Sequence, residues 1–311
     1  MGSVRRAVVD VGTNSVKLLV AEVTGQIVKP VLERSDQTRL GRGFYETRRL
    51  QFQAITQTAA AVARYVGLAA HEDVSSIRVI ATSAARDASN AEDLLSAIHR
   101  SAGRRVEVIS GDQEAEWVFR GVMSDPKHAG QRLLILDVGG GSTEFILGEG
   151  AHHLFRQSFD LGSVRLLEKL RPGDPPSLAD LAGCRSWLKD FFNEQMGPKL
   201  ESLLRGAEGI RLIGTGGTTT ILARMEGRME DFDRDRIEAT CFSRQTILEY
   251  MVRLWSLSVA QRKEIVGLPP KRADIIPFGV AIYEAVMEHF QFAELHVSTR
   301  GLRFGALLDE P

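Results

Sequence analysis

Two stretches of the sequence, Asp10-Val11-Gly12-Thr13-Asn14-Ser15 and Asp137-Val138-Gly139-Gly140-Gly141-Ser142-Thr143-Glu144, share one order of residue types. Each follows a short apolar run and places an acid first, then glycine, then hydroxyl side chains. An acid at a strand end can hold a metal ion, and a glycine turn can present backbone N–H groups to a phosphate. The repetition predicts a duplicated fold with two phosphate-binding turns.

The residues after each turn are apolar and partly β-branched, at 16–23 and at 145–148, and each run soon reaches glycine. Such a run predicts a second strand and therefore a β-hairpin, whereas a P-loop or a dinucleotide-binding turn opens directly into a helix. The sequence contains no GxxxxGK[ST] motif. The hairpins therefore argue against the nucleotide-binding folds that hold phosphate at a helix N-terminus.

The composition is that of a globular protein: of 311 residues, 43% are hydrophobic and 25% are charged, and the length suggests two domains. No apolar run reaches eighteen residues, so we expect a cytoplasmic protein without membrane contact. A net charge of −1 provides no general attraction to nucleic acid. The spacing around the two cysteines, Cys184 and Cys241, indicates neither a disulfide framework nor a zinc site.

Hydrophobic periodicity predicts a similar order of elements in each half of the chain. Apolar residues spaced three and four apart predict a helix from Phe52 through Val66. The other elements expected in the first half are strands near 4–10, 16–23, 26–34, 77–81 and 106–109 and helices at 90–102 and 113–123. Pro126 and Gly130 mark a predicted hinge at 124–131, and the strand pattern restarts at Leu133.

The second half is expected to contain strands from 133 to about 159, helices over much of 162–204, a strand at 210–213, and mostly helices before a last strand at 295–298. Two halves that each begin with a phosphate-binding hairpin predict an α/β fold of the duplicated actin-like class (ASKHA, ribonuclease H-like). The predicted domains are 1–125 and 126–311, with a ligand cleft between them.

A third glycine turn, Gly214-Thr215-Gly216-Gly217-Thr218-Thr219-Thr220, lies between a predicted strand and a predicted helix. In a duplicated fold it would face the same ligand from the opposite wall of the cleft. Glycine is also what any sharp strand-to-helix connection requires. Both interpretations stay open for Gly216 and Gly217.

Five motifs occur in the order seen in the Ppx/GppA family of exopolyphosphatases and guanosine pentaphosphate phosphohydrolases, which this chain resembles. Besides the three glycine turns, they are 81–90 (ATSAARDASN) and 109–115 (ISGDQEA). Residues 272–276 (RADII) and 298–303 (STRGLR) are similar to later signatures of the family, so the resemblance spans nearly the whole chain. The chain resembles the short two-domain members of the family, which lack the extra helical domain of the long members.

The resemblance implies a catalytic base. Glu114 matches the second Glu of the family's Gly-x-Glu-Glu-Ala motif, which activates the attacking water. The residues alone leave another interpretation open, because Ser110 and Gln113 have capping-box spacing and a helix dipole stabilises acids in the first turn.

Two positions depart from the family pattern. Gln113 replaces the first Glu of the pair, which removes a negative charge beside the base and can shift its pKa or the metal preference. Phe304 stands where many members have Glu, which leaves the role of the C-terminal segment open.

Asp137 and Glu144 stand at the two ends of the second turn, and a hairpin can bring such ends together beside a phosphate. Carboxylate oxygens in this arrangement suit Mg²⁺ or Mn²⁺, and the resemblance implies that these positions bind the metal. A turn-stabilising Asp137 and a solvated Glu144 are the alternatives. Asp10 is the equivalent acid of the first turn and would hold metal or orient its loop.

Arg86 is the predicted phosphate clamp, since a guanidinium can contact two phosphate oxygens and stays charged. A surface ion pair with Asp87 is the alternative. The resemblance implies further phosphate-binding residues at Gly12, Thr13, Asn14, Ser15, Gly139, Gly140, Gly141, Ser142, Thr143, Ser163, Gly216 and Gly217, with Arg39 and Gly162 as secondary positions.

The resemblance implies a Mg²⁺-dependent exopolyphosphatase that releases terminal phosphate from linear polyphosphate, with Glu114 activating water in the cleft. The same machinery would remove the 5′ γ-phosphate of pppGpp, and no motif separates the two substrates. A sensor that binds a nucleotide or alarmone without turnover is the non-enzymatic alternative, and Arg86 and Glu114 argue against a kinase. A homodimer is the default expectation, as is closure of the cleft around the hinge.

Overall fold

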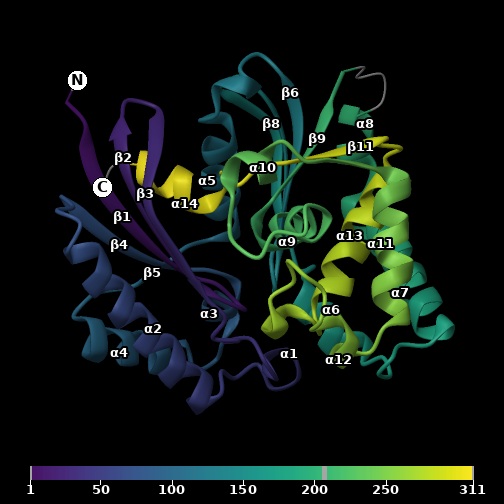
Figure 1. Cartoon of the computed structure of the whole chain (residues 1–311), viewed down its shortest axis with the longest axis horizontal. Coiled ribbons are helices and arrows are strands. Elements are labelled where there is room, and N and C mark those ends of the chain that lie inside the picture. The colour runs from purple at the N-terminus through teal and green to yellow at the C-terminus, as the bar shows by residue number, and fades with distance from the viewer. Residues whose placement is uncertain (1, 205–208, 310–311) are drawn as a thin grey trace.

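Two mixed sheets form the centre of the structure, a computed structural model that describes residues 2–204 and 209–309 (Figure 1). The first sheet has the strand order β3 (Ile27–Asp36), β2 (Val16–Thr24), β1 (Val4–Val11), β4 (Ser76–Ala81), β5 (Glu107–Val108). The second has the order β8 (His152–Phe159), β7 (Thr143–Glu149), β6 (Arg132–Val138), β9 (Arg211–Thr215), β11 (Glu294–Val297), β10 (Cys241–Ser243). The predicted strands are present, with ends shifted by a few residues.

Five strands of each sheet share one topology, which confirms the duplication, and β10 is an additional edge strand of the second sheet. In the first, β1, β2 and β3 are antiparallel and β4 joins β1 in parallel. In the second, β6, β7 and β8 are antiparallel and β9 joins β6 in parallel. The apolar run 133–136 of β6 is completely buried because both faces of its sheet are covered. Each half therefore carries its glycine hairpin at the same place in its sheet.

Helices form three layers around the two sheets (Figure 1). Apolar residues of α2 (Phe52–Ala70) and α4 (Ala91–Ala102) share a core with the first sheet. Those of α7 (Leu178–Phe191), α11 (Arg244–Ser256) and α13 (Ile276–His289) share a core with the second. Between the sheets lie α5 (Gly111–Met123) and α14 (Leu302–Leu308), in a core that includes strands of both halves.

The remaining helical segments are short and connect these layers. They are α1 (Phe44–Thr47), α3 (Ser83–Asp87), α6 (Ser163–Leu170), α8 (Gly197–Leu204), α9 (Gly216–Glu226), α10 (Arg234–Glu238), α12 (Val259–Arg262), and the turns η1 (Pro126–His128), η2 (Phe192–Met196) and η3 (Pro270–Arg272). The predicted hinge 124–131 connects α5 to β6 and contains η1. Its movement stays a prediction, as do the domain boundaries.

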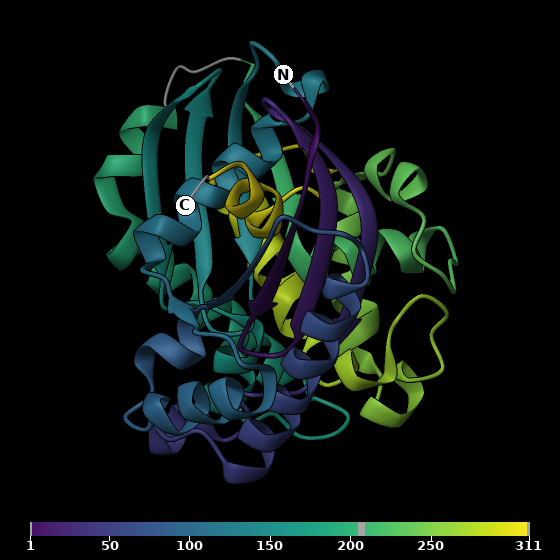
Figure 2. The ribbon, with the colours of Figure 1, turned by 90° about the vertical axis from the view of Figure 1, so that its left-hand side faces the viewer.

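The last helix returns to the first half of the molecule. Figure 2 shows α14, in yellow, beside the purple strands, and it packs mainly on α5 and also on β1. The two helices approach so closely that a Cβ at Gly305 would overlap the backbone of Trp117. Phe304 is fully buried in this layer, with the Arg234 guanidinium 5.1 Å from its ring centroid. The aromatic ring at this position therefore packs inside the interdomain layer.

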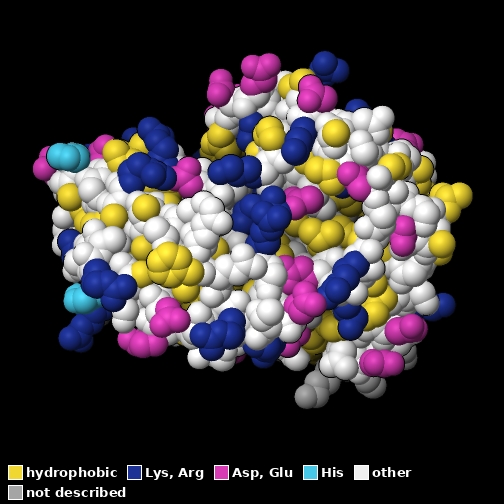
Figure 3. Space-filling model, turned by 90° about the horizontal axis from the view of Figure 1, so that it is seen from below, with side chains coloured by type: hydrophobic (Ala, Val, Ile, Leu, Met, Phe, Trp, Pro, Cys, Tyr) yellow, Lys and Arg dark blue, Asp and Glu magenta, His cyan; other side chains and the backbone are white. Residues whose placement is uncertain are grey.

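Within residues 2–204 and 209–309, no helix combines the length and the apolar character needed to cross a membrane. On the face shown in Figure 3, Lys and Arg side chains lie among Asp and Glu side chains. This mixing agrees with the net charge of −1 and leaves that face without a field of one sign.

Candidate active site

A cleft between the two halves encloses a cavity of about 680 Å³. Much of its wall comes from β1, β6, β9 and the segments that follow these strands. In each sheet, neighbouring parallel strands end at the same edge, and the two edges face the cleft. The predicted site residues that line it are Asp10, Gly12, Thr13, Asn14, Ser15, Glu114, Asp137, Gly139, Gly140, Gly141, Ser142, Glu144, Gly216 and Gly217.

The two glycine turns have the same backbone geometry and meet in the cleft. The Gly12 N–H donates to the Ser15 carbonyl at 2.9 Å, and the Gly139 N–H donates to the Ser142 carbonyl at 3.0 Å. A Cβ added at Gly140 would lie only 3.1 Å from the Cβ of Thr13. Glycine is therefore needed where the second turn approaches the first.

Strand register places the first acid of each hairpin opposite a side chain of the second strand, and the two hairpins differ in the charge of that partner. Asp10 faces Lys17 across β1 and β2, and Asp137 faces Glu144 across β6 and β7. Lys17 thus occupies in the first hairpin the position that Glu144 occupies in the second. The sequence analysis missed Lys17, although its seven-residue distance from Asp10 repeats the distance from Asp137 to Glu144.

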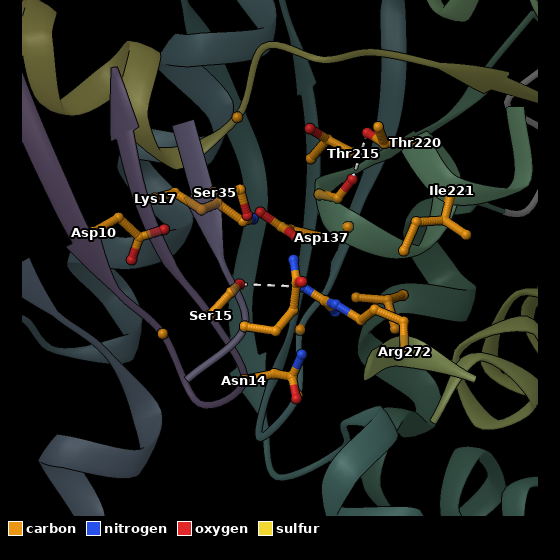
Figure 4. Close-up of a pocket in the computed structure, with 18 of the residues that line it drawn as sticks. Asp10, Asn14, Ser15, Lys17, Ser35, Asp137, Thr215, Thr220, Ile221 and Arg272 are labelled. Carbon is orange, nitrogen blue, oxygen red and sulfur yellow. Dashed lines mark hydrogen bonds between the residues drawn. The ribbon is translucent and has the colours of Figure 1, made fainter. Parts of the chain in front are cut away.

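Lys17 is the cation between the two aspartates. Its side chain extends toward Asp137 in Figure 4, and it lines the cavity. Burial lowers the pKa of Lys17, while the negative charges of Asp10 and Asp137 act to raise it. Lys17 therefore places an amino group beside the two aspartates, whose charges favour its protonated form while burial opposes it.

The three predicted metal ligands are buried carboxylates with elevated pKa values. Burial raises the pKa of Asp10 and of Asp137, and burial together with the Asp137 charge raises the pKa of Glu144 to about 7. Oδ1 of Asp10 is buried and has no hydrogen-bond partner among the residues that the structure describes. A Cβ at Gly216, whose φ is +85°, would collide with Oδ1 of Asp137. These oxygens fit a hard divalent cation in charge and donor type.

The arrangement leaves room for ligands other than protein. Among the described residues, Asp10, Asp137 and Glu144 do not form a group whose oxygens all lie within 4.8 Å of one another. Mg²⁺ commonly keeps several waters and uses only one or two carboxylates together with substrate phosphate. The spacing therefore suits a cation that is bound jointly with substrate.

Glu114 lies in the first turn of α5 at the edge of the cavity. Ser110 caps this helix by accepting a hydrogen bond from the Gln113 N–H at 3.1 Å, and Gln113 is half-buried whereas Glu114 is buried. Arg86 donates to Oε2 of Glu114 at 3.2 Å. Burial and the charge of Glu144 hold the pKa of Glu114 well above its usual range, and Arg86 acts to lower it. A carboxylate with a raised pKa is a stronger base when it is ionised than an ordinary Glu.

The sequence profile of the Ppx/GppA phosphatase family matches residues 19–310 of this chain. The chain belongs to the Ppx/GppA phosphatase family. Exopolyphosphatase 2 of Mycobacterium tuberculosis is 33% identical over 299 residues, which cover 91% of this chain and 90% of that protein. An exopolyphosphatase of Cytophaga hutchinsonii has a crystal structure with a TM-score of 0.87, at 28% identity and with 97% of this chain and 96% of that chain covered.

Two further structures support the fold. The Aquifex aeolicus member of the Ppx/GppA family has a TM-score of 0.79 and 29% identity, covering 99% of this chain and 97% of that chain. A nucleoside triphosphate hydrolase of Neospora caninum, at 10% identity and a TM-score of 0.55 with 99% of this chain and 92% of that chain covered, shares the fold alone. The duplicated actin-like architecture of this Ppx/GppA phosphatase is confirmed.

The third glycine turn forms the wall of the Ppx/GppA cleft opposite the first hairpin. Helix α9 begins at Gly216, as the strand-to-helix interpretation predicts, and both Gly216 and Gly217 also line the cavity. Arg272 lies close to Gly217 and donates to Oγ of Ser15 at 3.1 Å, which crosses the cleft (Figure 4). Arg272 and Arg303 line the cavity but were not predicted as site residues, because neither lies near a glycine turn in the sequence.

Five predicted phosphate-binding residues do not line the cavity: Arg86, which contacts Glu114 instead, and Thr143, Ser163, Arg39 and Gly162. The Thr143 hydroxyl is fully buried and donates to the Leu161 carbonyl at 2.6 Å. The Ser163 hydroxyl donates to the Gly139 carbonyl at 3.3 Å, so it stabilises the second turn and does not face the cavity. Arg39 forms an ion pair with Asp274. The role of Gly162 is structural as well, because a Cβ there would overlap the second turn.

Several apolar residues line the cavity, and we call five of them the apolar wall: Ile221, Phe232, Leu268, Pro269 and Pro270. Arg224 and Glu230 also line the cavity. Phe232 is 47% exposed although it is a large aromatic residue. A flat apolar group could pack on this wall, which the glycine motifs alone did not indicate.

Proposed function

We propose that this phosphatase is a Mg²⁺-dependent exopolyphosphatase, with Glu114 as the general base. The observation that carries the proposal is the buried Glu114, which accepts a hydrogen bond from the half-buried Arg86 and lines a cavity built from two phosphate-binding turns and three carboxylates. Relatives that cover nearly the whole chain carry the name exopolyphosphatase, which supports polyphosphate as the substrate.

In the proposed reaction, the terminal phosphate lies between the two glycine turns, where backbone N–H groups and hydroxyls donate to its oxygens. Glu114 takes a proton from a water molecule whose oxygen forms a bond to the terminal phosphorus. The bond from that phosphorus to the bridging oxygen breaks, and the shortened chain keeps this oxygen. Arg86 orients Glu114 and adds positive charge at the phosphate.

Asp10, Asp137 and Glu144 would hold the divalent cation. When bound, this ion would neutralise negative charge on the phosphoryl oxygens. Arg272 and Lys17 line the cavity on different elements and would contribute positive charge to it. Together these groups balance a polyanionic substrate in a site whose own carboxylates would otherwise repel it.

A second substrate is favoured by the apolar wall. Phe232, Leu268 and Pro269 present a surface on which a purine could stack, while the glycine turns hold its 5′ phosphates. Hydrolysis of the terminal 5′ phosphate of pppGpp would need the same base and cation. Linear polyphosphate has no group that would use this wall.

The test compares phosphate release from long-chain polyphosphate and from pppGpp, each with and without Mg²⁺. Release from polyphosphate that depends on Mg²⁺ is the expected result. Release only from pppGpp would show that the protein hydrolyses this alarmone and not polyphosphate. Binding of either compound without any release would overturn the enzymatic proposal in favour of a sensor.

Lys17→Met is expected to lower kcat/KM by about ten- to a hundredfold, since one charge-assisted contact to phosphate is worth about 1.5–3 kcal/mol. The same variant should need less Mg²⁺ for half-maximal rate, because a cation that competes for Asp10 and Asp137 has been removed. Steady-state kinetics at varied Mg²⁺ measure both effects. Lys17→Arg, which retains the charge, is the matched control, and an unchanged Mg²⁺ requirement in Lys17→Met would contradict the assigned role.

A further inference from the structure

Three side chains with metal-binding chemistry meet at the outer edge of the second sheet, away from the cleft. Cys241 on β10 lies directly opposite His296 on β11, and Glu294 precedes His296 by two residues. Alternation along a strand therefore places all three on one face of the sheet. Sγ of Cys241 is 3.9 Å from Nε2 of His296, and this nitrogen is 3.4 Å from Oε2 of Glu294.

These distances are close to the ligand–ligand distances of a tetrahedral zinc site. With Zn–S near 2.3 Å and Zn–N and Zn–O near 2.0–2.2 Å, a tetrahedral site has ligand–ligand distances of about 3.4–3.6 Å. One ligand atom from each of Cys241, Glu294 and His296 lies within 4.8 Å of the other two. Shifts of a few tenths of an ångström to about one ångström would complete the geometry.

We propose that Cys241, Glu294 and His296 bind Zn²⁺ or a divalent ion of similar preference, with a fourth position open to water. A thiolate and an imidazole select zinc-like ions over Mg²⁺, which prefers oxygen ligands. The thiolate and the carboxylate together neutralise a divalent charge. Cys241 and Glu294 are exposed, so an ion can reach the site from solvent.

The spacing of the cysteines does not indicate this site, because its ligands come from two segments that only strand pairing brings together. β10 has three residues, and its strand partner is β11. An ion bound by both strands would tie β10 to the sheet. Just after β11, Thr299 and Gly301 line the cavity, so the site lies at the start of a segment that reaches the cleft. This proposal does not depend on the substrate of the enzyme.

The experiment uses the full chain after removal of metals with a chelator. Zn²⁺ is titrated against a chromophoric competitor, and Co²⁺ is added separately to detect the near-ultraviolet band of a cobalt–thiolate bond. The expected result is one Zn²⁺ bound per chain, a cobalt–thiolate band, and a rise in melting temperature with Zn²⁺ that Mg²⁺ does not reproduce. Cys241→Ser should remove the band, and His296→Ala should weaken Zn²⁺ binding at least about tenfold.

His71→Ala, which removes an exposed histidine in the first half, is the matched control and should bind like the wild type. Cys184 is buried in the core of the second half, so it cannot produce the band without unfolding. Zn²⁺ bound only by the carboxylates of the cleft would persist in Cys241→Ser and show no thiolate band. That result, or the absence of Zn²⁺ binding, would overturn the proposal. Circular dichroism of each variant checks that loss of binding is not loss of fold.

Discussion

Replacing Glu114 by glutamine should lower kcat for phosphate release by about 10²–10⁴-fold, the contribution expected of a positioned general base. Glutamine keeps the shape of the side chain, and its carbonyl oxygen can still accept the hydrogen bond from Arg86. It cannot take a proton from water. Because the phosphate-binding turns are untouched, KM should change by no more than a few-fold. Initial rates with the preferred substrate at saturating Mg²⁺ measure both parameters.

The pH profile gives an independent check on Glu114. The base must be ionised to act, and burial raises its pKa, so wild-type kcat should increase with pH through the pKa of the folded protein. The residual rate of Glu114→Gln should lack this increase. Asp112→Asn is the matched control, since Asp112 lies in the same helical turn but pairs with Arg156 on the protein surface. A Glu114→Gln variant that keeps more than a tenth of the wild-type kcat would place the base elsewhere.

Glu144→Gln should abolish most activity and yet stabilise the metal-free protein at pH 8. Loss of a metal-holding carboxylate removes several kcal/mol of charge stabilisation, so we expect a decrease of about 10²-fold or more in kcat/KM. The pKa of Glu144 is about 7 in the folded protein against 4.5 for an ordinary Glu. The folded state therefore binds this proton more tightly, and its stability falls as pH rises from about 4.5 to about 7. Glutamine removes this penalty, of the order of 1–3 kcal/mol.

Thermal unfolding at pH 5 and pH 8 without divalent cations measures the effect. Glu144→Gln should lose less stability than the wild type between the two values, and Mg²⁺ should stabilise the wild type more strongly than the variant at pH 8. Glu149→Gln, at the exposed end of the same strand, should behave like the wild type. An identical pH dependence in the wild type and in Glu144→Gln would show that Glu144 does not carry the buried charge.

The fold was predictable because its decisive residues are local. A strand, a glycine turn and a second strand form one contiguous hairpin, and its repetition after 127 residues, from Asp10 to Asp137, gives the duplicated architecture. The acids at the hairpin ends could be placed in the cleft for the same reason. Glu114 needed the family motif, since its position alone also suits a helix cap.

Other parts of the site depend on contacts that sequence separation hides. Arg272 reaches Ser15 across the cleft, and α3, which carries Arg86, brings that residue to Glu114 only after β4 and α5 pack. Thr143 was predicted to bind phosphate because it belongs to the motif of the second turn. Its hydroxyl instead donates to the buried Leu161 carbonyl. A motif shows which backbone approaches phosphate, but tertiary packing decides where each side chain points.

The paired helices α5 and α14 act as a wedge between the two sheets. They meet backbone to backbone, so closely that a Cβ at Gly121 would overlap the Gly301 carbonyl. The predicted hinge 124–131 follows α5 directly, so if the halves rotate, these two helices lie beside the pivot, in a core to which both sheets contribute. Glu114, in the first turn of α5, would then move little. The opposite wall, which contains Arg272, would move the substrate toward Glu114. Such a rotation would change the contacts to phosphate while Glu114 keeps its position.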